Sequence, residues 1–428
     1  MSRKVAFKTL GCRLNQFETD ALVSRFDKAG YQVVEYGNET DVTIVNTCTV
    51  TNKSDQKSKN LINKAARISD KGVVVVTGCM ADHYKKQLEQ QDNITYVVDN
   101  ARKSSIPELI DAHFKGEILH PEKMPSEVFG FNEVDKSLHT RAAVKIQDGC
   151  DNFCTFCIIP QVRGRASSRP LDEILHSVQQ TINNGFKEIV VTGVNIGRYD
   201  YNGYSFEDVI ERILDLPGDF RVRISSLEPD GFGERFLDLF EHPKLTPHLH
   251  LCLQSGSDRV LLRMRRMYDV KTYRKWVDKI RSRYPGFNLS TDVIVGFPGE
   301  TEEDFRATAD FIEDIGFAHV HTFKYSKRDG TRAARMDEQV PEQVKNERSE
   351  VIRELSNKKK TEYYRTFIGR EQQVLTEKNG SGSFSGYGEH YVPVFLDEPS
   401  VGRNEFHRVR IDKVSGHNNK PVLEGKLI

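Results

Sequence analysis

The sequence lacks the marks of several protein classes. No run of 18 apolar residues occurs among its 428 residues, so no membrane span is expected. No internal repeat or low-complexity tract stands out. The 62 basic and 62 acidic residues cancel, so only local patches can indicate a nucleic-acid partner. The start, "MSRKVAFKTLGC", enters a strand pattern without a signal-peptide core, so we expect a cytoplasmic protein.

Cysteine is scarce. Seven cysteines in a long chain without a secretory signal argue against a disulfide framework and favour metal ligands or core thiols. A hydrophobic content of 37% and a charged content of 29% fit a globular protein with a polar surface. The length is too great for one core, so two or three domains are expected.

The chain divides into three segments by pattern. Residues 1–125 alternate apolar strand patterns with helical ones, which predicts an α/β domain with an open parallel sheet. After a linker-like stretch at 120–137, residues 139–365 repeat the strand–helix alternation six times, which predicts a partial (β/α)6 barrel that ends in a charged helix. Residues 366–428 contain short strands split by Gly, Ser and Asn, which predicts a small all-β domain.

Three cysteines stand close together in "GCDNFCTFC". Cys150, Cys154 and Cys157 have the spacing C-x3-C-x2-C and follow the first predicted barrel strand, where barrel enzymes place their active sites. Three thiolates can hold three irons of a cubane cluster and leave the fourth iron open to a substrate. A zinc knuckle with a remote ligand is the alternative, but zinc sites favour paired C-x2-C elements.

Three further cysteines lie far apart in sequence. Cys12, Cys48 and Cys79 occur in "TLGC", "VNTC" and "VTGC", each directly after one of the first three predicted strands. The carboxyl ends of parallel strands meet at one edge of a sheet, so the three thiols are expected to meet there. They predict a second three-ligand cluster, and buried core cysteines are the alternative.

The C-x3-C-x2-C motif after a first barrel strand resembles the radical S-adenosylmethionine (SAM) superfamily. Together with the second cysteine set and the C-terminal β domain, the whole chain resembles the radical SAM methylthiotransferases. The resemblance implies an N-terminal methylthiotransferase domain (1–125), a radical SAM barrel (139–365) and an RNA-binding TRAM domain (366–428). It also implies two [4Fe-4S] clusters and two SAM molecules, one a methyl donor and the other a source of the 5′-deoxyadenosyl radical.

Several polar residues at predicted strand ends are candidates for SAM contacts by this resemblance. They follow the second, third and fourth barrel strands, and any one alone is a weak indicator: Gly193, Asn195, Ser225, Glu228 and Gln254. Cys252 alternates with His248 and His250 in "HLHLCL", which is typical of an interior barrel layer, so we assign it no role.

The substrate expectation rests on resemblance. "TLGCRLNQFETD" is similar to the branch that methylthiolates C2 of N6-threonylcarbamoyladenosine (t6A) at position 37 of tRNA. Isopentenyladenosine in tRNA and a ribosomal-protein aspartate are the alternatives within the family. Outside it, an iron–sulfur electron carrier, an RNA-binding regulator and a zinc-binding RNA module remain open.

Basic stretches supply candidate RNA contacts. Lys and Arg concentrate in 258–283 and 324–335, and basic patches of this kind bind the phosphates of RNA. The alternative is an ordinary charged helix surface, which is common. The candidates are Arg163, Arg165, Arg265, Arg266, Arg408 and Arg410. Besides tRNA, we expect an electron donor such as flavodoxin or ferredoxin. The sequence names neither the sulfur donor nor a group that acts as acid or base.

Overall fold

The computed structural model describes residues 2–68, 72–131, 140–378, 384–396, 401–417 and 420–428. Contacts divide the chain into two compact units. Unit 1 comprises Met1–Asn184, Thr192–Val194 and Ser326–Ala334, and unit 2 comprises Gly185–Val191, Asn195–Tyr325 and Arg335–Ile428.

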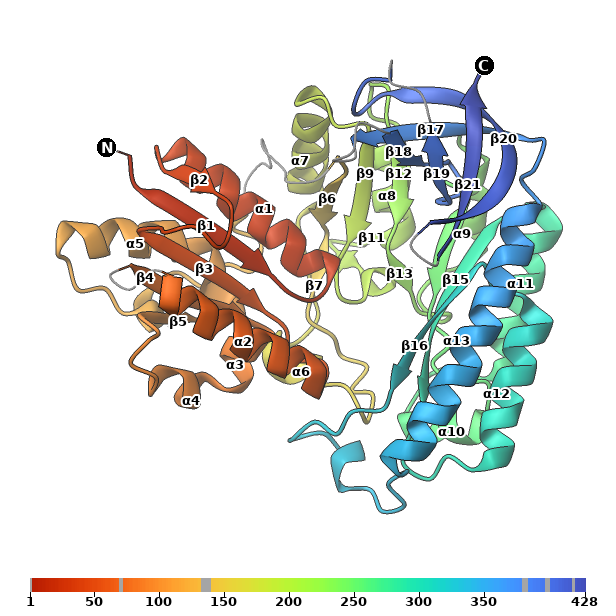
Figure 1. Cartoon of the computed structure of the whole chain (residues 1–428), viewed down its shortest axis with the longest axis horizontal. Coiled ribbons are helices and arrows are strands. Elements are labelled where there is room, and N and C mark those ends of the chain that lie inside the picture. Colours follow the sequence, from red (N-terminus) through yellow and green to blue (C-terminus); the bar gives the residue numbers. More distant parts are fainter. Residues whose placement is uncertain (1, 69–71, 132–139, 379–383, 397–400, 418–419) are drawn as a thin grey trace. The chain divides into compact units, whose positions relative to one another are not determined.

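Unit 1 is built on an open sheet of five parallel strands in the order β2-β1-β3-β4-β5 (Figure 1). The strands are β1 (Lys4–Thr9), β2 (Gln32–Val34), β3 (Val42–Thr47), β4 (Val73–Gly78) and β5 (Tyr96–Val98). β3 and β4 are buried along their whole length, because helices cover both faces of the sheet. The sequence patterns predicted β1, β3, β4 and β5 but not the short strand β2.

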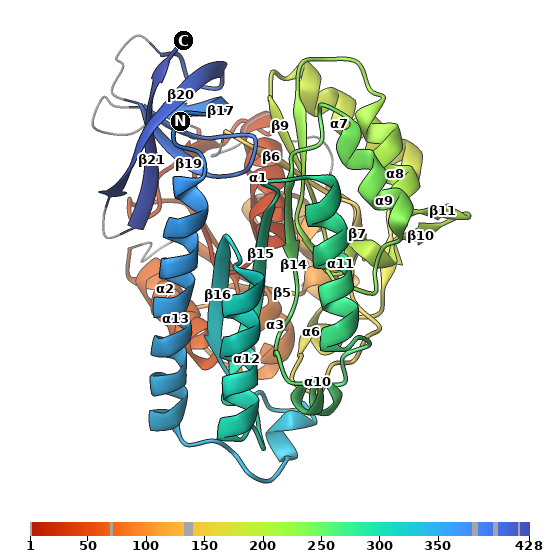
Figure 2. The same cartoon turned by 90° about the vertical axis from the view of Figure 1, so that its right-hand side faces the viewer.

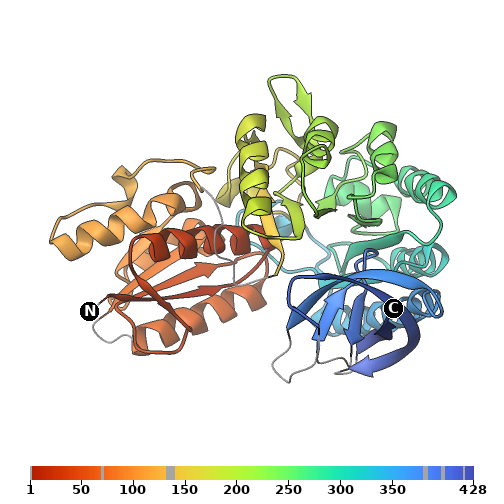
Figure 3. The same cartoon turned by 90° about the horizontal axis from the view of Figure 1, so that it is seen from above.

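Two helical layers enclose this sheet (Figure 3). One core packs α1 and α5 against the sheet through residues such as Phe26 and Ile110, and the other packs α2, α3 and α4 through residues such as Ile62 and Leu88. The helices of this part are α1 (Arg13–Lys28), α2 (Asn52–Ile68), α3 (Cys79–His83), α4 (Lys85–Glu89), η1 (Asn100–Ser105), α5 (Ile106–Lys115) and η2 (Pro121–Lys123).

The rest of unit 1 carries a closed loop. The short strands β7 (Gln147–Asp148) and β8 (Ser167–Ser168) pair antiparallel and join the two ends of residues 149–166. The other elements here are β6 (Ala142–Lys145), α6 (Ile159–Val162) and α7 (Leu171–Asn183). The later part of the expected linker, 132–137, lies outside the described residues.

Unit 2 contains parallel strands with helices beside them (Figure 2). β9 pairs with β12, and β13, β14, β15 and β16 form a second parallel group. The bounds are β9 (Glu188–Thr192), η3 (Ile196–Arg198), β10 (Asp200–Tyr201), β11 (Tyr204–Ser205), α8 (Phe206–Leu214), β12 (Arg221–Ile224), β13 (Ser226–Leu227), α9 (Glu234–Asp238), η4 (Leu239–Glu241), β14 (His248–Leu251), α10 (Asp258–Met264), α11 (Val270–Arg283), β15 (Asn288–Val295), α12 (Glu302–Ile315), β16 (His319–Lys324), η5 (Ala333–Arg335) and α13 (Glu342–Arg365).

Unit 2 ends in a small closed β-barrel. Its strands run in the order β17-β18-β19-β21-β20, with bounds β17 (Glu371–Lys378), β18 (Phe384–Tyr387), β19 (Pro393–Leu396), β20 (Phe406–His417) and β21 (Lys420–Leu427). Tyr364 and Phe367, at the end of α13 and just after it, pack into its core. The Arg221 guanidinium donates to the carbonyls of Gln373 and Tyr387, so partly buried hydrogen bonds fix the small barrel to the parallel strands.

The expected fold class is confirmed: α/β, with an open parallel sheet near the N-terminus and a small closed β-barrel at the C-terminal end. In chain order, the strands β6, β9, β12, β14, β15 and β16 are followed by the helices α7, α8, α9, α11, α12 and α13, with shorter elements between them. No described helix has the length and apolar character needed to span a bilayer.

Candidate functional site

The three dispersed cysteines leave the same edge of the unit 1 sheet. Thr9 of β1 pairs with Asn46 of β3, and Thr47 pairs with Gly78 of β4, so the three strands end almost level. Cys12, Cys48 and Cys79 follow within three residues. In this strand order β1 and β3 flank the point where the connections reverse direction, which is where open α/β sheets bind ligands.

Two glycines allow these three loops to approach one another closely. A Cβ on Gly11, whose φ is +101°, would lie 3.1 Å from the Cys48 sulfur, so the Cys12 loop touches Cys48. A Cβ on Gly78, whose φ is +93°, would lie 2.3 Å from the Thr47 carbonyl oxygen. Both the positive φ and the close approach require glycine.

The thiols also influence one another electrostatically. Burial raises the pKa of the Cys79 thiol to about 11, and the charges of Cys12 and Cys48 add to that rise. Burial likewise raises the pKa of Cys48, again with a contribution from Cys12. Burial and neighbouring thiols thus make the thiolates of Cys48 and Cys79 unfavourable, and a bound cation would relieve that cost.

The local cysteines lie in the closed loop 149–166. The Cys150 amide donates to the Gly164 carbonyl at 3.2 Å, and the Cys157 amide donates to the Cys154 carbonyl at 3.0 Å. A Cβ on Gly149 would lie 2.0 Å from the Arg165 carbonyl oxygen, so only glycine fits where the loop closes. Cys150, Cys154 and Cys157 are all partly exposed.

One cysteine of the dispersed set, Cys79, contacts the segment that follows the local motif within unit 1. Cys79 packs against Ile158 and Val162, which directly follow the local cysteine motif. The Asn100 side-chain amide donates to the Val162 carbonyl at 2.9 Å and approaches the Cys79 sulfur at 3.9 Å. The two sets therefore belong to one structural region.

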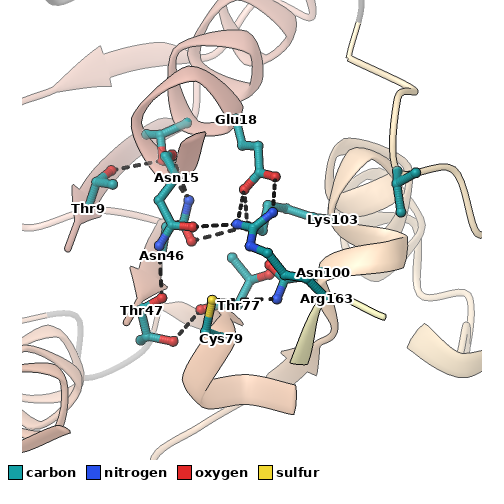
Figure 4. Close-up of polar contacts among 12 residues, drawn as sticks. Thr9, Asn15, Glu18, Asn46, Thr47, Thr77, Cys79, Asn100, Lys103 and Arg163 are labelled. Carbon is teal, nitrogen blue, oxygen red and sulfur yellow. Dashed lines mark hydrogen bonds and ion pairs between the residues drawn. The ribbon is translucent and has the colours of Figure 1, made fainter. Parts of the chain in front are cut away.

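A buried ionic network connects the surroundings of both sets (Figure 4). The Arg163 guanidinium donates to Asn15 Oδ1 at 2.7 Å and to Glu18 Oε1 at 3.0 Å, both on the helix that Cys12 begins. It also contacts Asp148, two residues before Cys150, at 3.0 Å. Arg163 thus connects the helix that follows Cys12 with the segment that precedes Cys150.

Two lysines complete this network. Lys103 and Lys145 both pair with Glu18, and Lys145 also pairs with Asp148 at 2.5 Å. Burial raises the pKa of Glu18, but the charges of Arg163, Lys103 and Lys145 outweigh it and hold the pKa well below its usual range. These five side chains carry three positive and two negative charges, an excess that favours anionic groups nearby.

A distant segment reaches the Cys48 loop. Arg328, in the part of unit 1 that follows β16, donates to the Thr49 carbonyl and to Asp55 Oδ2, each at 2.7 Å. In the same segment the Ala333 amide donates to the Thr155 carbonyl at 2.8 Å, between Cys154 and Cys157. We call residues 326–334 the strap, because one short segment holds both cysteine loops.

The donor set fits iron–sulfur clusters. Each set offers three thiolates, the preferred ligand of such clusters, and so leaves one iron free. The excess of positive charge nearby suits anionic groups. Buried core thiols, the alternative for the dispersed set, do not account for Cys12, which is exposed.

The expected SAM contacts lie at strand ends of the barrel region. Gly193 and Asn195 follow β9, Ser225 lies between β12 and β13, and Glu228 follows β13. Gln254 follows β14 with a φ of +67°, a conformation that costs energy for a residue with a side chain and that clusters at functional sites. Nothing in the structure assigns SAM to them, so they remain candidates.

Two expected RNA contacts are placed in the interior. The Arg163 side chain is only 1% exposed and Arg266 only 4%, and Arg266 pairs with Glu228. Their charges are already matched by carboxylates, buried in Glu18 and Asp148 and partly buried in Glu228, which argues against direct phosphate contact. Arg165, Arg265, Arg408 and Arg410 are exposed.

Sequence reasoning missed the ionic network and the strap. One signal was available, because Glu18 falls on the helical stripe of Leu14, Ala21 and Leu22, where an apolar residue is expected. The buried positions of Lys103 and Arg328 gave no such pattern.

Comparison with known proteins agrees with these observations. Residues 4–99 match the model of uncharacterized protein family UPF0004, and residues 144–312 match the radical SAM superfamily. The chain is 38% identical to a threonylcarbamoyladenosine tRNA methylthiotransferase MtaB of Bacillus subtilis, over 99% of this chain and 96% of the relative. It is 36% identical to a tRNA-2-methylthio-N(6)-dimethylallyladenosine synthase of Fusobacterium nucleatum, over 88% of each.

A solved structure supports the fold. The radical SAM methyltransferase TsrM from Kitasatospora setae matches with a TM-score of 0.56 and 16% identity, over 78% of this chain and 77% of that one. At this identity the match concerns the fold alone. The full-length sequence matches go further, and the chain therefore belongs to the radical SAM methylthiotransferase family of enzymes.

Proposed function

We propose that this enzyme methylthiolates C2 of t6A at position 37 of tRNA and converts it to ms2t6A. The observation that carries the proposal is that two three-thiol sets belong to one region of unit 1, where Cys79 packs against the residues that follow the local motif. The choice of substrate is supported by the relatives from Bacillus subtilis and Thermotoga maritima. Both are named threonylcarbamoyladenosine tRNA methylthiotransferase, and they are 38% and 37% identical to this chain over nearly its whole length.

In this proposal Cys150, Cys154 and Cys157 hold the [4Fe-4S] cluster that binds SAM, and Cys12, Cys48 and Cys79 hold an auxiliary [4Fe-4S] cluster. When bound, these groups supply electron transfer to SAM and a site for the sulfur that is transferred. Two SAM molecules are used in each turnover.

The chain's own residues position these ligands. Gly149, Gly78 and Gly11 allow the cysteine loops to close on their neighbours, and Arg163 holds the two loop bases together. Gly193, Asn195, Ser225, Glu228 and Gln254 are proposed to contact SAM. Glu228 would do so with Arg266 fixing its carboxylate, a positioning task that replaces the RNA contact expected of Arg266.

The RNA would contact the exposed arginines. Arg165, Arg265, Arg408 and Arg410 are proposed as phosphate contacts, the last two from β20 of the small barrel, which we propose acts as a TRAM domain. We retain residues 1–125, 139–365 and 366–428 as the proposed functional domains. We also propose a cytoplasmic location, where tRNA is found, and an electron donor such as a flavodoxin or ferredoxin.

The test uses anaerobically reconstituted enzyme with SAM, reductant and tRNA that contains t6A or isopentenyladenosine. We expect ms2t6A by nucleoside mass spectrometry and little product from the isopentenyl substrate. Product from the isopentenyl substrate alone would overturn the substrate assignment. Failure to form 5′-deoxyadenosine with either tRNA would overturn the proposed reaction itself.

A further inference from the structure

One face of the β14–β16 group carries polar, metal-ligating side chains. On β14 and just beyond it, His250 and Cys252 alternate onto the same face. On the neighbouring strand, Ser290 pairs in register with His250, and Asp292 lies two residues further on that face. Adjacent strands therefore bring His250, Cys252 and Asp292 together on a rigid scaffold.

The ligand atoms of the three side chains lie close enough to one another to bind a single ion. Their ligand atoms, an imidazole nitrogen, a thiol sulfur and a carboxylate oxygen, all lie within 4.8 Å of one another. His250 Nε2 is 3.2 Å from Asp292 Oδ1. Cys252 is buried and the other two are partly buried, so a bound ion would be shielded yet still reachable.

Neighbouring groups fix these ligands in place. His250 Nδ1 lies 3.0 Å from Ser290 Oγ, which leaves Nε2 directed at Asp292. The Tyr268 hydroxyl donates to the Cys252 carbonyl at 2.7 Å and so holds the backbone of the thiol. A second hydrogen bond that orients the ring is the usual support for a metal-binding histidine.

We propose that His250, Cys252 and Asp292 form a binding site for a divalent transition metal, with Zn²⁺ as the preferred ion. A thiolate, an imidazole and a carboxylate match the ligands that zinc takes in proteins. Three protein ligands leave one tetrahedral position open, which suits water or a carboxylate oxygen of a ligand. His321, the register partner of Asp292, lies with its ring 5.5 Å from that of His250 and is the nearest additional donor.

This site uses none of the six cluster cysteines. A simple His250–Asp292 ion pair would explain the 3.2 Å contact, but it gives no reason for Cys252 on the same face within 4.8 Å. The two interpretations differ in one measurable respect, because only a metal site loses its ion when the thiol is replaced.

The experiment loads the full-length, cluster-reconstituted enzyme with micromolar Zn²⁺, removes loose metal by gel filtration, and measures zinc and iron per chain. We expect about one zinc per chain, with the iron content unchanged. Zinc K-edge absorption should show about one sulfur neighbour at roughly 2.3 Å among nitrogen and oxygen neighbours.

Variants Cys252→Ser and Asp292→Asn should bind zinc at least about tenfold more weakly while they retain their iron, which reports correct folding. The control is His242→Gln, a partly buried histidine of unit 2 outside the three ligands and the groups described as holding them, and it should bind zinc like the unaltered enzyme. Equal zinc in all variants overturns the proposal. So does zinc surrounded by three or four sulfurs, which would place the ion on cluster cysteines.

Discussion

The two cysteine sets each gather three thiols, but they do so by different structural means. Cys150, Cys154 and Cys157 lie within eight residues of one loop that β7 and β8 close at its base. Cys12, Cys48 and Cys79 are spread over 68 residues and meet only because three parallel strands end level at one edge. The local set depends on one loop, whereas the dispersed set depends on a whole domain. The following predictions test that contrast.

The largest effect is expected from removing either set entirely. Replacing Cys150, Cys154 and Cys157 by Ala should lower iron from about eight to about four per chain and abolish 5′-deoxyadenosine formation. Replacing Cys12, Cys48 and Cys79 by Ala should lower iron equally but preserve SAM cleavage while abolishing methylthiolation. Iron analysis and product chromatography test both. If the second variant also fails to cleave SAM while it remains folded, the division of labour is wrong.

Breaking the bridge between the sets should have the next largest effect. Arg163→Met leaves Glu18 and Asp148 with less positive charge, so we expect a loss of about 3–5 kcal/mol in the free energy of unfolding of unit 1. Denaturant unfolding of the apo-protein measures it. Arg165→Met, at an exposed neighbour, is the control and should cost little. Equal costs in the two variants would contradict the buried role of Arg163.

Two glycine substitutions should damage one set each. Gly149→Ala places a Cβ 2.0 Å from the Arg165 carbonyl oxygen, and Gly78→Ala places one 2.3 Å from the Thr47 carbonyl oxygen. Each should destabilise its own loop by about 2–4 kcal/mol and reduce iron binding at that set alone. Iron content, combined with SAM cleavage, separates the two outcomes.

The control for Gly149 is Gly164→Ala, in the same loop with a φ of +77° and no heavy atom within 4 Å of the added Cβ. It carries the backbone strain without the clash and should cost about 1 kcal/mol. If it removes as much iron as Gly149→Ala, the close approach at residue 149 is not what matters.

A smaller effect, limited to the Cys48 loop of the dispersed set, is expected from a change in the strap. Arg328→Gln removes the buried pair with Asp55 and the hydrogen bond to the Thr49 carbonyl, so the Cys48 loop should loosen by about 2–3 kcal/mol. Hydrogen exchange of residues 48–55 measures the change. Arg332→Gln, exposed on the same segment, should leave exchange unaltered. A uniform increase across unit 1 would contradict a local action.

The smallest effect concerns a residue in the C-terminal barrel and should spare both cysteine sets. Burial lowers the pKa of His390 to about 4, so the folded protein binds this proton less readily than the unfolded chain does. Stability is therefore full above pH 6.5 and falls as the pH drops towards 4, by about 1–2 kcal/mol at pH 5. Thermal melts of His390→Gln should show a flatter pH dependence between 6.5 and 4. A dependence equal to that of the unaltered protein would contradict the shift.

The contrast also explains what the sequence revealed. The local triplet is visible without a structure, and the dispersed set became visible because buried strands such as Val73–Gly78 have an unmistakable apolar pattern. β2 (QVV) and β18 (FSGY) escaped prediction because they are short and not part of a longer apolar run, whereas the equally short β5 lies within the apolar run ITYVVD. The burial of Arg163 could not be predicted because arginine is nearly always exposed, and only the folded chain shows the carboxylates that make its burial possible.

The strap has a consequence for biosynthesis. Thr49 and Asp55 belong to a loop made early, yet the guanidinium that fixes them comes from residue 328, made some 280 residues later. The strands of the N-terminal sheet all precede that arginine in the chain, so its two contacts with the Cys48 loop can form only after it has left the ribosome. If the dispersed set holds a cluster as proposed, we expect its insertion to follow translation of β16.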